Sequence, residues 1–245
     1  NLADGDEIVA KAKAKGKKVA VAHQGAYLSR IQYVKEILAA GRIGEVQAIY
    51  AHGKQDRRGG GEDMVVLGTH LFNMMRLFVG DVDWMSAHIT YEGRELDVGD
   101  VHEADEPVGP IAGDCVNAYF AFKSGVAGFF DSRKFTEGGG KRMGMEIVGS
   151  EGTILLRGGG SGVAMLYPHT VLDPADQGQR WEDIDEVADE PLSTGNDLAI
   201  GDLIDAAEND REPISSARDA VAALEMILGA YEAQITGGRV HFPLQ

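Results

Sequence analysis

Gly59-Gly60-Gly61-Glu62-Asp63-Met64-Val65-Val66-Leu67-Gly68-Thr69-His70-Leu71-Phe72-Asn73-Met74-Met75-Arg76-Leu77-Phe78 is the stretch on which the fold depends. Three consecutive glycines permit backbone angles closed to other residues, so the chain can turn sharply and deliver the next segment into a cleft. Apolar residues then recur near helical spacing, and Gly80 supplies a stop. This pattern predicts one core-facing helix from about Glu62 to Val79.

His70 lies in the middle of that predicted helix, beside the small residues Gly68 and Thr69. An imidazole titrates near neutrality, and a lone polar group is costly to bury. A histidine on an apolar helix therefore has a hydrogen-bond partner or a chemical task. From this stretch alone, a satisfied core histidine and a site residue are both open interpretations.

The composition is that of an ordinary globular protein, with 245 residues and 44% apolar content. Lys and Arg number 23 against 39 Asp and Glu, so the net charge is 23 − 39 = −16. That field repels phosphate backbones and anionic lipid surfaces, so we expect neither a nucleic acid nor a membrane partner. The single cysteine, Cys115, excludes an intrachain disulfide framework and favours a reducing, cytoplasmic location. No apolar run is long enough to span a bilayer, and the first residues do not form a signal peptide.

Helical patterns occupy both ends of the chain, and alternating apolar residues typical of strands occupy the middle. The strand patterns include 45–52, 84–91, 116–122 and 126–133. An acidic insertion, Glu92 to Asp114, separates two of them and is too long for a hairpin turn, so it is a functional flap or a mobile loop.

Consecutive strands joined by tight turns pair antiparallel, and the flanking helices must cover one face. The predicted fold class is therefore α+β, an open and mostly antiparallel sheet with helices packed on one face. The other face, expected to be rich in Phe, Met and Val, would remain wet in a monomer. We therefore predict a homodimer or larger assembly formed through the sheet face.

The sequence lacks the glycine fingerprint of a dinucleotide-binding loop. The clusters 138–140 and 158–162 lie among predicted antiparallel strands without a following helix, so both are predicted to be turns. His52, His70 and Asp63 do not have the spacing of metal ligands, and we expect no metal site.

Several stretches together resemble the C-terminal domain of the Gfo/Idh/MocA oxidoreductases, the family of glucose-fructose oxidoreductase and inositol dehydrogenase. The resemblance covers essentially the whole chain. Its segments are Val19 to Gln24, Val34 to Val46, the glycine turn with Gly68 to Phe72, Ile147 to Ile154, Tyr231 to Ala233 and Gly237 to Pro243.

The resemblance implies that residues 1–245 form a substrate-binding and dimerisation domain. Residues 1–22 would be the tail of a crossover from a dinucleotide-binding domain that is absent from this chain. NAD or NADP would then be held mainly by that absent domain. The lack of an initiator methionine agrees with a chain that begins partway through a longer product.

In the resembling family, a histidine matching His70 moves the proton of the reacting hydroxyl, so His70 is the expected catalytic residue. His23 is the expected cofactor contact. Where members commonly have an aspartate four residues before this histidine, the chain has Val66, which can neither orient the imidazole nor relay a proton. The expected substrate-binding residues are Gln24, Tyr27, Arg57, Asp63 and Asn73.

The predicted function is the substrate-binding and catalytic half of an NAD(P)-dependent oxidoreductase acting on a sugar or polyol hydroxyl, with a small carbohydrate as substrate. Two alternatives remain open. One is a sugar lyase or hydrolase on the same fold, with Val66 as the trace of changed chemistry. The other is a non-catalytic sugar-binding module.

Overall fold

One large sheet organises the chain in the computed structural model, which describes all residues except 137, 159–161, 171–172, 174, 177 and 245. The strand order is β11-β10-β9-β8-β1-β7-β6-β2-β12, and β3 pairs with β2. The strands of this sheet are β1 (Val46–His52), β2 (Val82–Tyr91), β3 (Arg94–Glu95), β6 (Cys115–Phe122), β7 (Ala127–Arg133), β8 (Gly144–Gly149), β9 (Thr153–Arg157), β10 (Ala164–Tyr167), β11 (Glu182–Asp183) and β12 (Val240–His241).

Helices occupy both ends of the chain and the segment after β1. Short 3₁₀ turns occur at Val98–Asp100 and Gly139–Arg142, the second within the predicted glycine turn at 138–140. The turn predicted at 158–162 lies largely outside the described residues. The helices are α1 (Leu2–Ala14), α2 (Gln24–Tyr27), α3 (Ser29–Ala39), α4 (Gly61–Asp63), α5 (Thr69–Val79), α6 (Thr194–Glu208) and α7 (Ala217–Thr236), with a π-helix at Met64–Gly68 between α4 and α5.

The sheet is antiparallel except at its centre, where β1 runs parallel to β7. The route of the chain from β1 to β7 explains this exception. The chain leaves β1 through the glycine turn, forms α5, and returns along β2 and β6 before β7. Strand β1 therefore lies between β7 and β8, and the start of the helical run is anchored at the middle of the sheet.

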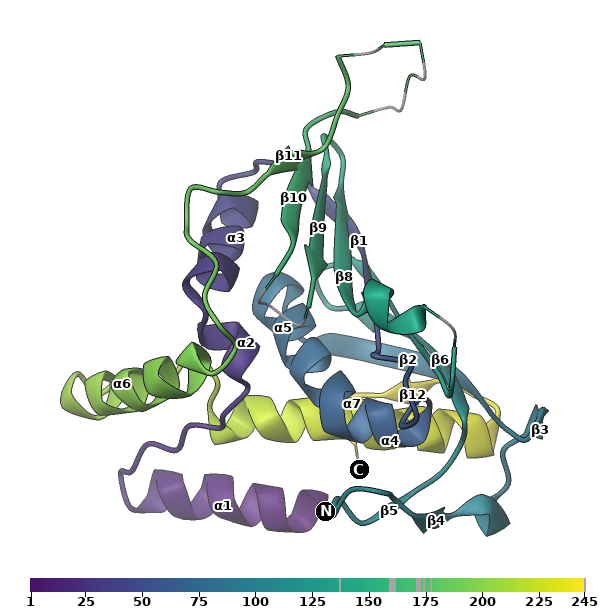
Figure 1. Cartoon of the computed structure of the whole chain (residues 1–245). Coiled ribbons are helices and arrows are strands. Elements are labelled where there is room, and N and C mark those ends of the chain that lie inside the picture. The colour runs from purple at the N-terminus through teal and green to yellow at the C-terminus, as the bar shows by residue number, and fades with distance from the viewer. Residues whose placement is uncertain (137, 159–161, 171–172, 174, 177, 245) are drawn as a thin grey trace.

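Helices α5 and α7 pack on one face of the sheet, as Figure 1 shows. Phe72 of α5 meets Phe120 of β6 and Phe130 of β7 at ring-centroid distances of 5.4 and 4.9 Å. All three side chains are fully buried. Burial of large aromatic side chains contributes strongly to stability, so this cluster fixes α5 on the sheet. The predicted fold class is confirmed.

The opposite, open face carries a row of aromatic side chains that crosses four strands. Tyr50 stacks on Phe129 at 4.7 Å, and Phe129 meets Tyr119 at 5.3 Å. Trp84 follows at 5.2 Å from Tyr119, and the Arg239 guanidinium lies over its ring. The expectation of a face rich in Phe, Met and Val was wrong in its details. The alternation of the strands places Met85 and Met145 under the helices instead.

Two local features precede α2 and α3. Residues 18–22 form a half-buried segment in which only Ala20 makes a β-bridge, to Ser216. Ser29 does not cap α3 with its side chain. Its backbone N–H donates instead to the Glu190 carboxylate at 2.8 Å.

The acidic insertion is fixed to the glycine turn by its own carboxylates. Arg57 binds Asp105 at 2.9 Å, and Arg58 binds Glu106 at 2.7 Å. In return, the buried Glu62 carboxylate accepts the backbone N–H groups of Asp105 and Glu106. Strands β4 (His102–Glu103) and β5 (Pro110–Ile111) pair within the insertion. It is therefore a folded flap over the start of the helical run.

Within the described ranges, no helix has both the length and the apolar character needed to cross a bilayer.

Candidate active site

The three glycines of the turn let the helical run begin between β7 and the insertion. A Cβ on Gly59 would lie 2.3 Å from the backbone of Arg133, and one on Gly61 would lie 2.1 Å from the Ala112 carbonyl oxygen. A Cβ on Gly60, whose φ is 87°, would lie 2.6 Å from the backbone of Asp114. Only glycine allows this approach, which the sequence pattern predicted as a sharp turn.

The helical run is not one regular α-helix, because Met64–Gly68 is a π-helix. Such segments insert extra residues per turn and are frequent at functional sites. The wider turns of the π-helix rotate Asp63 relative to His70. The two residues therefore do not share a face, as residues seven apart on an α-helix would.

His70, in the first turn of α5, is half-buried and lies against His23, which immediately precedes α2. The two rings meet edge to face, with centroids 5.2 Å apart and planes at 87°. His23 is 4% exposed. Its Nδ1 is 2.9 Å from the Ser215 hydroxyl and its Nε2 is 3.2 Å from the Thr69 hydroxyl. Both ring nitrogens of His23 are thus occupied, and the imidazole is held in a fixed orientation towards His70.

Both imidazoles are uncharged at neutral pH. Burial, and secondarily the neighbouring His70, lowers the pKa of His23 to about 4. Burial also lowers the pKa of His70, and no carboxylate among the described residues offsets that effect. A neutral imidazole accepts a proton, so His70 has the protonation state that a general base requires.

Asp63 points into a different environment. One of its carboxylate oxygens accepts the backbone N–H of Gln55 and the hydroxyl of Ser132, while the other has no partner within the described part of the chain. Burial raises the pKa of this fully buried carboxyl. Ser132 in turn accepts the backbone N–H of Gly60. The carboxyl of Asp63 therefore joins the glycine turn to β7.

The other predicted site residues are distributed around the histidine pair. Asn73 is buried one turn after His70 on α5. Gln24 begins α2, next to His23, and its backbone lies against Gly195 of α6. Tyr27 is buried, and its hydroxyl exchanges hydrogen bonds with the backbone of Ser215. Arg57 lies apart, exposed and paired with the insertion.

Two residues of this arrangement were missed by the sequence analysis. Thr69 adjoins His70 in sequence, but nothing in the sequence signals its bond to His23. Ser215 is separated from His23 by 192 residues. The pattern Ser216 to Asp219, a capping box at the start of α7, was readable and would have placed Ser215 at a helix entrance.

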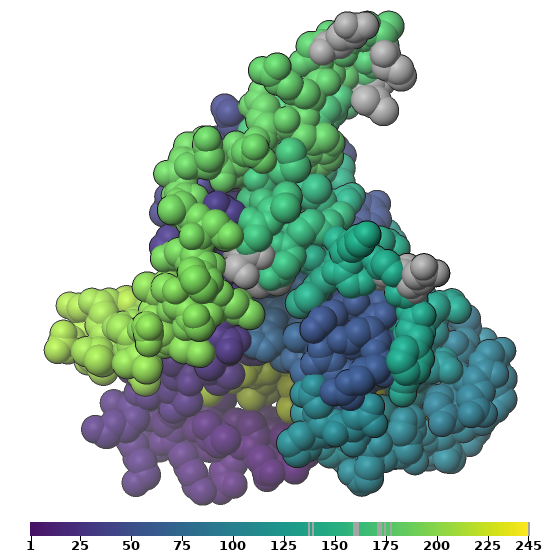
Figure 2. All heavy atoms as spheres, in the orientation of Figure 1, coloured from purple at the N-terminus to yellow at the C-terminus, as the bar shows by residue number. Residues whose placement is uncertain are grey.

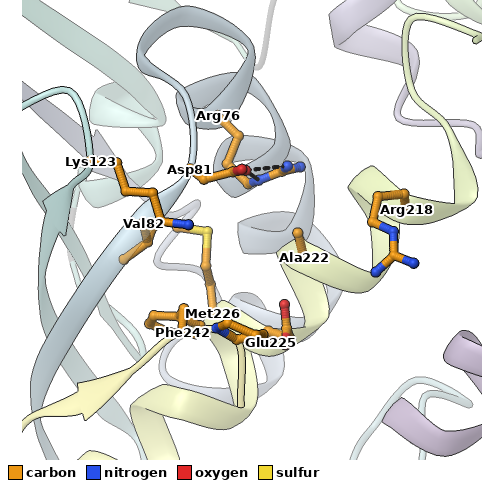
Figure 3. A pocket seen from close by; sticks show the side chains of 10 residues that line it. Arg76, Asp81, Val82, Lys123, Arg218, Ala222, Glu225, Met226 and Phe242 are labelled. Carbon is orange, nitrogen blue, oxygen red and sulfur yellow. Dashed lines mark hydrogen bonds and ion pairs between the residues drawn. The ribbon is translucent and has the colours of Figure 1, made fainter.

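The described residues contain no group of three or more His, Cys, Asp or Glu arranged to hold a metal ion. Two cavities are lined by residues of α7. One of about 710 Å³ lies between α1 and α7, and a second of about 240 Å³ lies between α5 and α7 (Figure 3).

Comparison with known proteins identifies the family of this domain. Residues 35–242 match the model of an oxidoreductase family, described as its C-terminal alpha/beta domain and known as Gfo/Idh/MocA. No curated protein matches the sequence.

Solved structures share the fold at low sequence identity. An NAD-binding oxidoreductase from Klebsiella pneumoniae aligns with a TM-score of 0.78 at 17% identity, over 100% of this chain and 72% of its own. The aldose-aldose oxidoreductase from Caulobacter crescentus, solved with glycerol, gives 0.71 at 17%, over 99% and 69%. The WlbA dehydrogenase from Bordetella pertussis, solved with NADH and UDP-GlcNAcA, gives 0.68 at 18%, over 100% and 69%. The family match covers most of the sequence, and the chain therefore belongs to the Gfo/Idh/MocA oxidoreductases, as their C-terminal alpha/beta domain.

Proposed function

We propose that this chain is the substrate-binding and catalytic half of an NAD(P)-dependent oxidoreductase acting on a sugar or polyol hydroxyl, with His70 as the proton acceptor and donor. The observation that carries the proposal is a neutral, half-buried imidazole fixed against a second neutral imidazole at the start of α5. The family supplies the reaction class, and similar structures were solved with NADH and a sugar nucleotide or with glycerol.

In the proposed reaction, His70 takes the hydroxyl proton as the carbon–oxygen bond becomes a carbonyl. The bound nicotinamide supplies the acceptor for the hydride that leaves the same carbon. Burial makes the protonated form of His70 costly, so the proton is readily passed on or returned in the reverse direction. His23 keeps the His70 ring in place, because its own ring is held by Thr69 and Ser215.

We assign substrate contacts to Asn73 and Gln24, which adjoin the histidine pair. Asp63 and Arg57, the other predicted substrate contacts, lie away from the histidine pair, with Asp63 bound to Ser132 and Arg57 paired with Asp105, so we assign them no contact to the reacting hydroxyl. Tyr27 has a positioning role, because its hydroxyl is hydrogen-bonded to the backbone of Ser215, the residue whose side chain holds His23.

A nucleotide-binding domain would fit against the edge of the molecule that carries α1 and α6. In Figures 1 and 2, α6 projects from the body on the same side as α1. Ile8 of α1 is 53% exposed, and Ile200 and Ile204 of α6 are 61% and 55% exposed. The extended segment 18–22 has a single bridging residue, which leaves backbone groups available to a neighbouring strand. His23, which we propose as the cofactor contact, follows this segment directly.

The direct test is hydride transfer by the natural protein that contains this chain, followed by nicotinamide absorbance over a panel of sugars and polyols. The variant His70→Ala is expected to lower turnover by roughly 10²-fold or more, the usual contribution of a general base. His88→Ala is the matched control, because His88 is exposed on β2 and pairs with Glu95. Equal turnover of His70→Ala and the natural protein would refute the role of His70.

A non-redox lyase is the second candidate, and Val66 favours it. No carboxylate influences the pKa of His70, so the acid and base pair of a typical family member is not reproduced here. Product analysis separates the two functions. A lyase gives an unsaturated or cleaved sugar without a change in the redox state of the nicotinamide.

A further inference from the structure

The cavity between α5 and α7 has a distinctive set of charges. Figure 3 shows Lys123 and Arg218 on opposite sides, with the Arg76–Asp81 pair and Glu225 between them. Lys123 comes from the turn between β6 and β7, and Arg218 comes from the first turn of α7. Its volume of about 240 Å³ is below that of pockets for drug-sized ligands, so it suits a small molecule.

The carboxylates around this cavity are already occupied. Asp81 binds the Arg76 guanidinium at 2.6 Å, and Glu225 accepts the backbone N–H of Leu244 at 3.0 Å. Arg76 is further held by the carboxylate of Asp219. Lys123 and Arg218 also form no ion pair with any residue of the described ranges. These two cations outnumber Glu225, the one lining carboxylate without an ion pair there, so the cavity keeps an excess of positive charge in a protein of net charge −16 and favours an anion.

The floor of the cavity is apolar. Val82 and Met226 are buried there, and Phe242 and Ala222 complete the lining. An inorganic anion would lose hydration against this surface without compensation, whereas a hydrocarbon group would gain from contact with it. The chemistry therefore favours a ligand with a charged end and a short apolar body.

We propose that this cavity binds a small free carboxylic acid, with its carboxylate between Lys123 and Arg218 and its hydrocarbon part on Met226 and Phe242. The site is separate from the proposed substrate site. The two sites are linked through Arg76, which binds Asp219. The Asp219 carboxylate in turn accepts hydrogen bonds from Ser216, the N-cap of α7, and Ser216 directly follows Ser215, which holds His23.

The test is calorimetric titration of the 245-residue chain with butyrate, acetate and inorganic phosphate at low ionic strength. Butyrate is expected to bind at one saturable site, more tightly than acetate or phosphate. The double variant Lys123→Gln/Arg218→Gln is expected to weaken butyrate binding at least tenfold. Both side chains are exposed, so the fold should be retained, and thermal unfolding checks this.

Two further variants complete the design. Ala222→Leu fills the apolar floor without changing charge and is expected to abolish butyrate binding. Lys35→Gln removes the same charge from exposed α3, outside the cavity, and is expected to leave binding unchanged. Absence of saturable butyrate binding up to roughly 10 mM would overturn the proposal. Undiminished binding by the folded double variant, or tighter binding of phosphate than of butyrate, would overturn it equally.

Discussion

His23 and His70 are two imidazoles kept uncharged by their surroundings. Burial disfavours the cationic form of each, and a charge on one would oppose a charge on the other across 5.2 Å. Near neutral pH the histidine pair can therefore take up at most one proton beyond those of the two neutral rings. A single incoming proton on His70 is the event that the proposed reaction needs.

The stability of the protein should carry the signature of His23. The pKa of His23 falls from 6.5 in the unfolded chain to about 4 in the folded protein. The contribution of neutral His23 to the free energy of unfolding is therefore fully present above pH 6.5. That stability is lost as pH falls from 6.5 to about 4, by on the order of 3 kcal/mol. Urea unfolding at a series of pH values measures the loss. His23→Asn, which cannot be charged, should show a shallower decline, whereas His88→Asn should follow the natural protein.

Activity should show the lowered pKa of His70. A general base works in its neutral form, so kcat/KM falls on the acid side as the imidazole is protonated. Because burial lowers this pKa, the acid limb is expected below pH 6.5. A pH profile of kcat/KM with the best substrate of the panel checks this. An acid limb centred at or above pH 6.5 would contradict the assignment.

At the scale of elements, the glycine turn and the π-helix together set the position of His70. Apolar spacing predicted a helix here, and the structure has one, but spacing alone does not distinguish a π-helix from an α-helix. The reason is that the apolar residues Val66, Leu67 and Phe72 fit the spacing of either kind of helix to within one residue. The three glycines were interpretable as a sharp turn, but the segments that approach them, β7 and the insertion, are distant in sequence.

A methyl group at Gly61 should be poorly tolerated. It would lie 2.1 Å from the Ala112 carbonyl oxygen and 2.6 Å from the Tyr231 hydroxyl, so backbone must shift. Gly61→Ala is expected to destabilise the fold by about 1–3 kcal/mol, the usual cost of overpacking. Gly201→Ala is the matched control. Gly201 has open space around it in helix α6, and the substitution should stabilise the helix by up to about 1 kcal/mol. Denaturant unfolding of both variants gives the comparison.

The strand patterns illustrate what a sequence can and cannot specify. Alternation located β2, β6 and β7 within two residues, and the short turn between β6 and β7 gave the antiparallel pairing of those two strands. The parallel pairing of β1 with β7 was not accessible, because it joins residues about eighty positions apart and depends on all the elements from α4 to β6 between them. For the same reason, the sequence predicted a role for His70 but gave no sign of the Ser215 hydroxyl that supports its neighbour His23.

On the scale of the whole molecule, the open face of the sheet carries a row of neighbouring aromatic side chains. Four rings from four strands form the row of Tyr50, Phe129, Tyr119 and Trp84. Aromatic residues are enriched at protein interfaces, and a two-fold dimer uses the same surface of both copies. We propose that two copies associate through it.

A charge placed in that row should separate the copies. Phe129→Glu is expected to give monomers in sedimentation velocity at micromolar concentration, while the natural chain sediments as a dimer. Phe135→Glu is the control, since Phe135 is 73% exposed after β7, beyond the row. A natural chain that sediments only as a monomer would contradict the proposed dimer.

The bond between His23 and Ser215 closes the chain upon itself across 192 positions. On the ribosome, both histidines emerge well before the hydroxyl that holds the His23 ring. The orientation of His23 is therefore fixed only after the chain has been made as far as Ser215, and a product cut short before α7 would carry the histidine pair without this hydrogen bond.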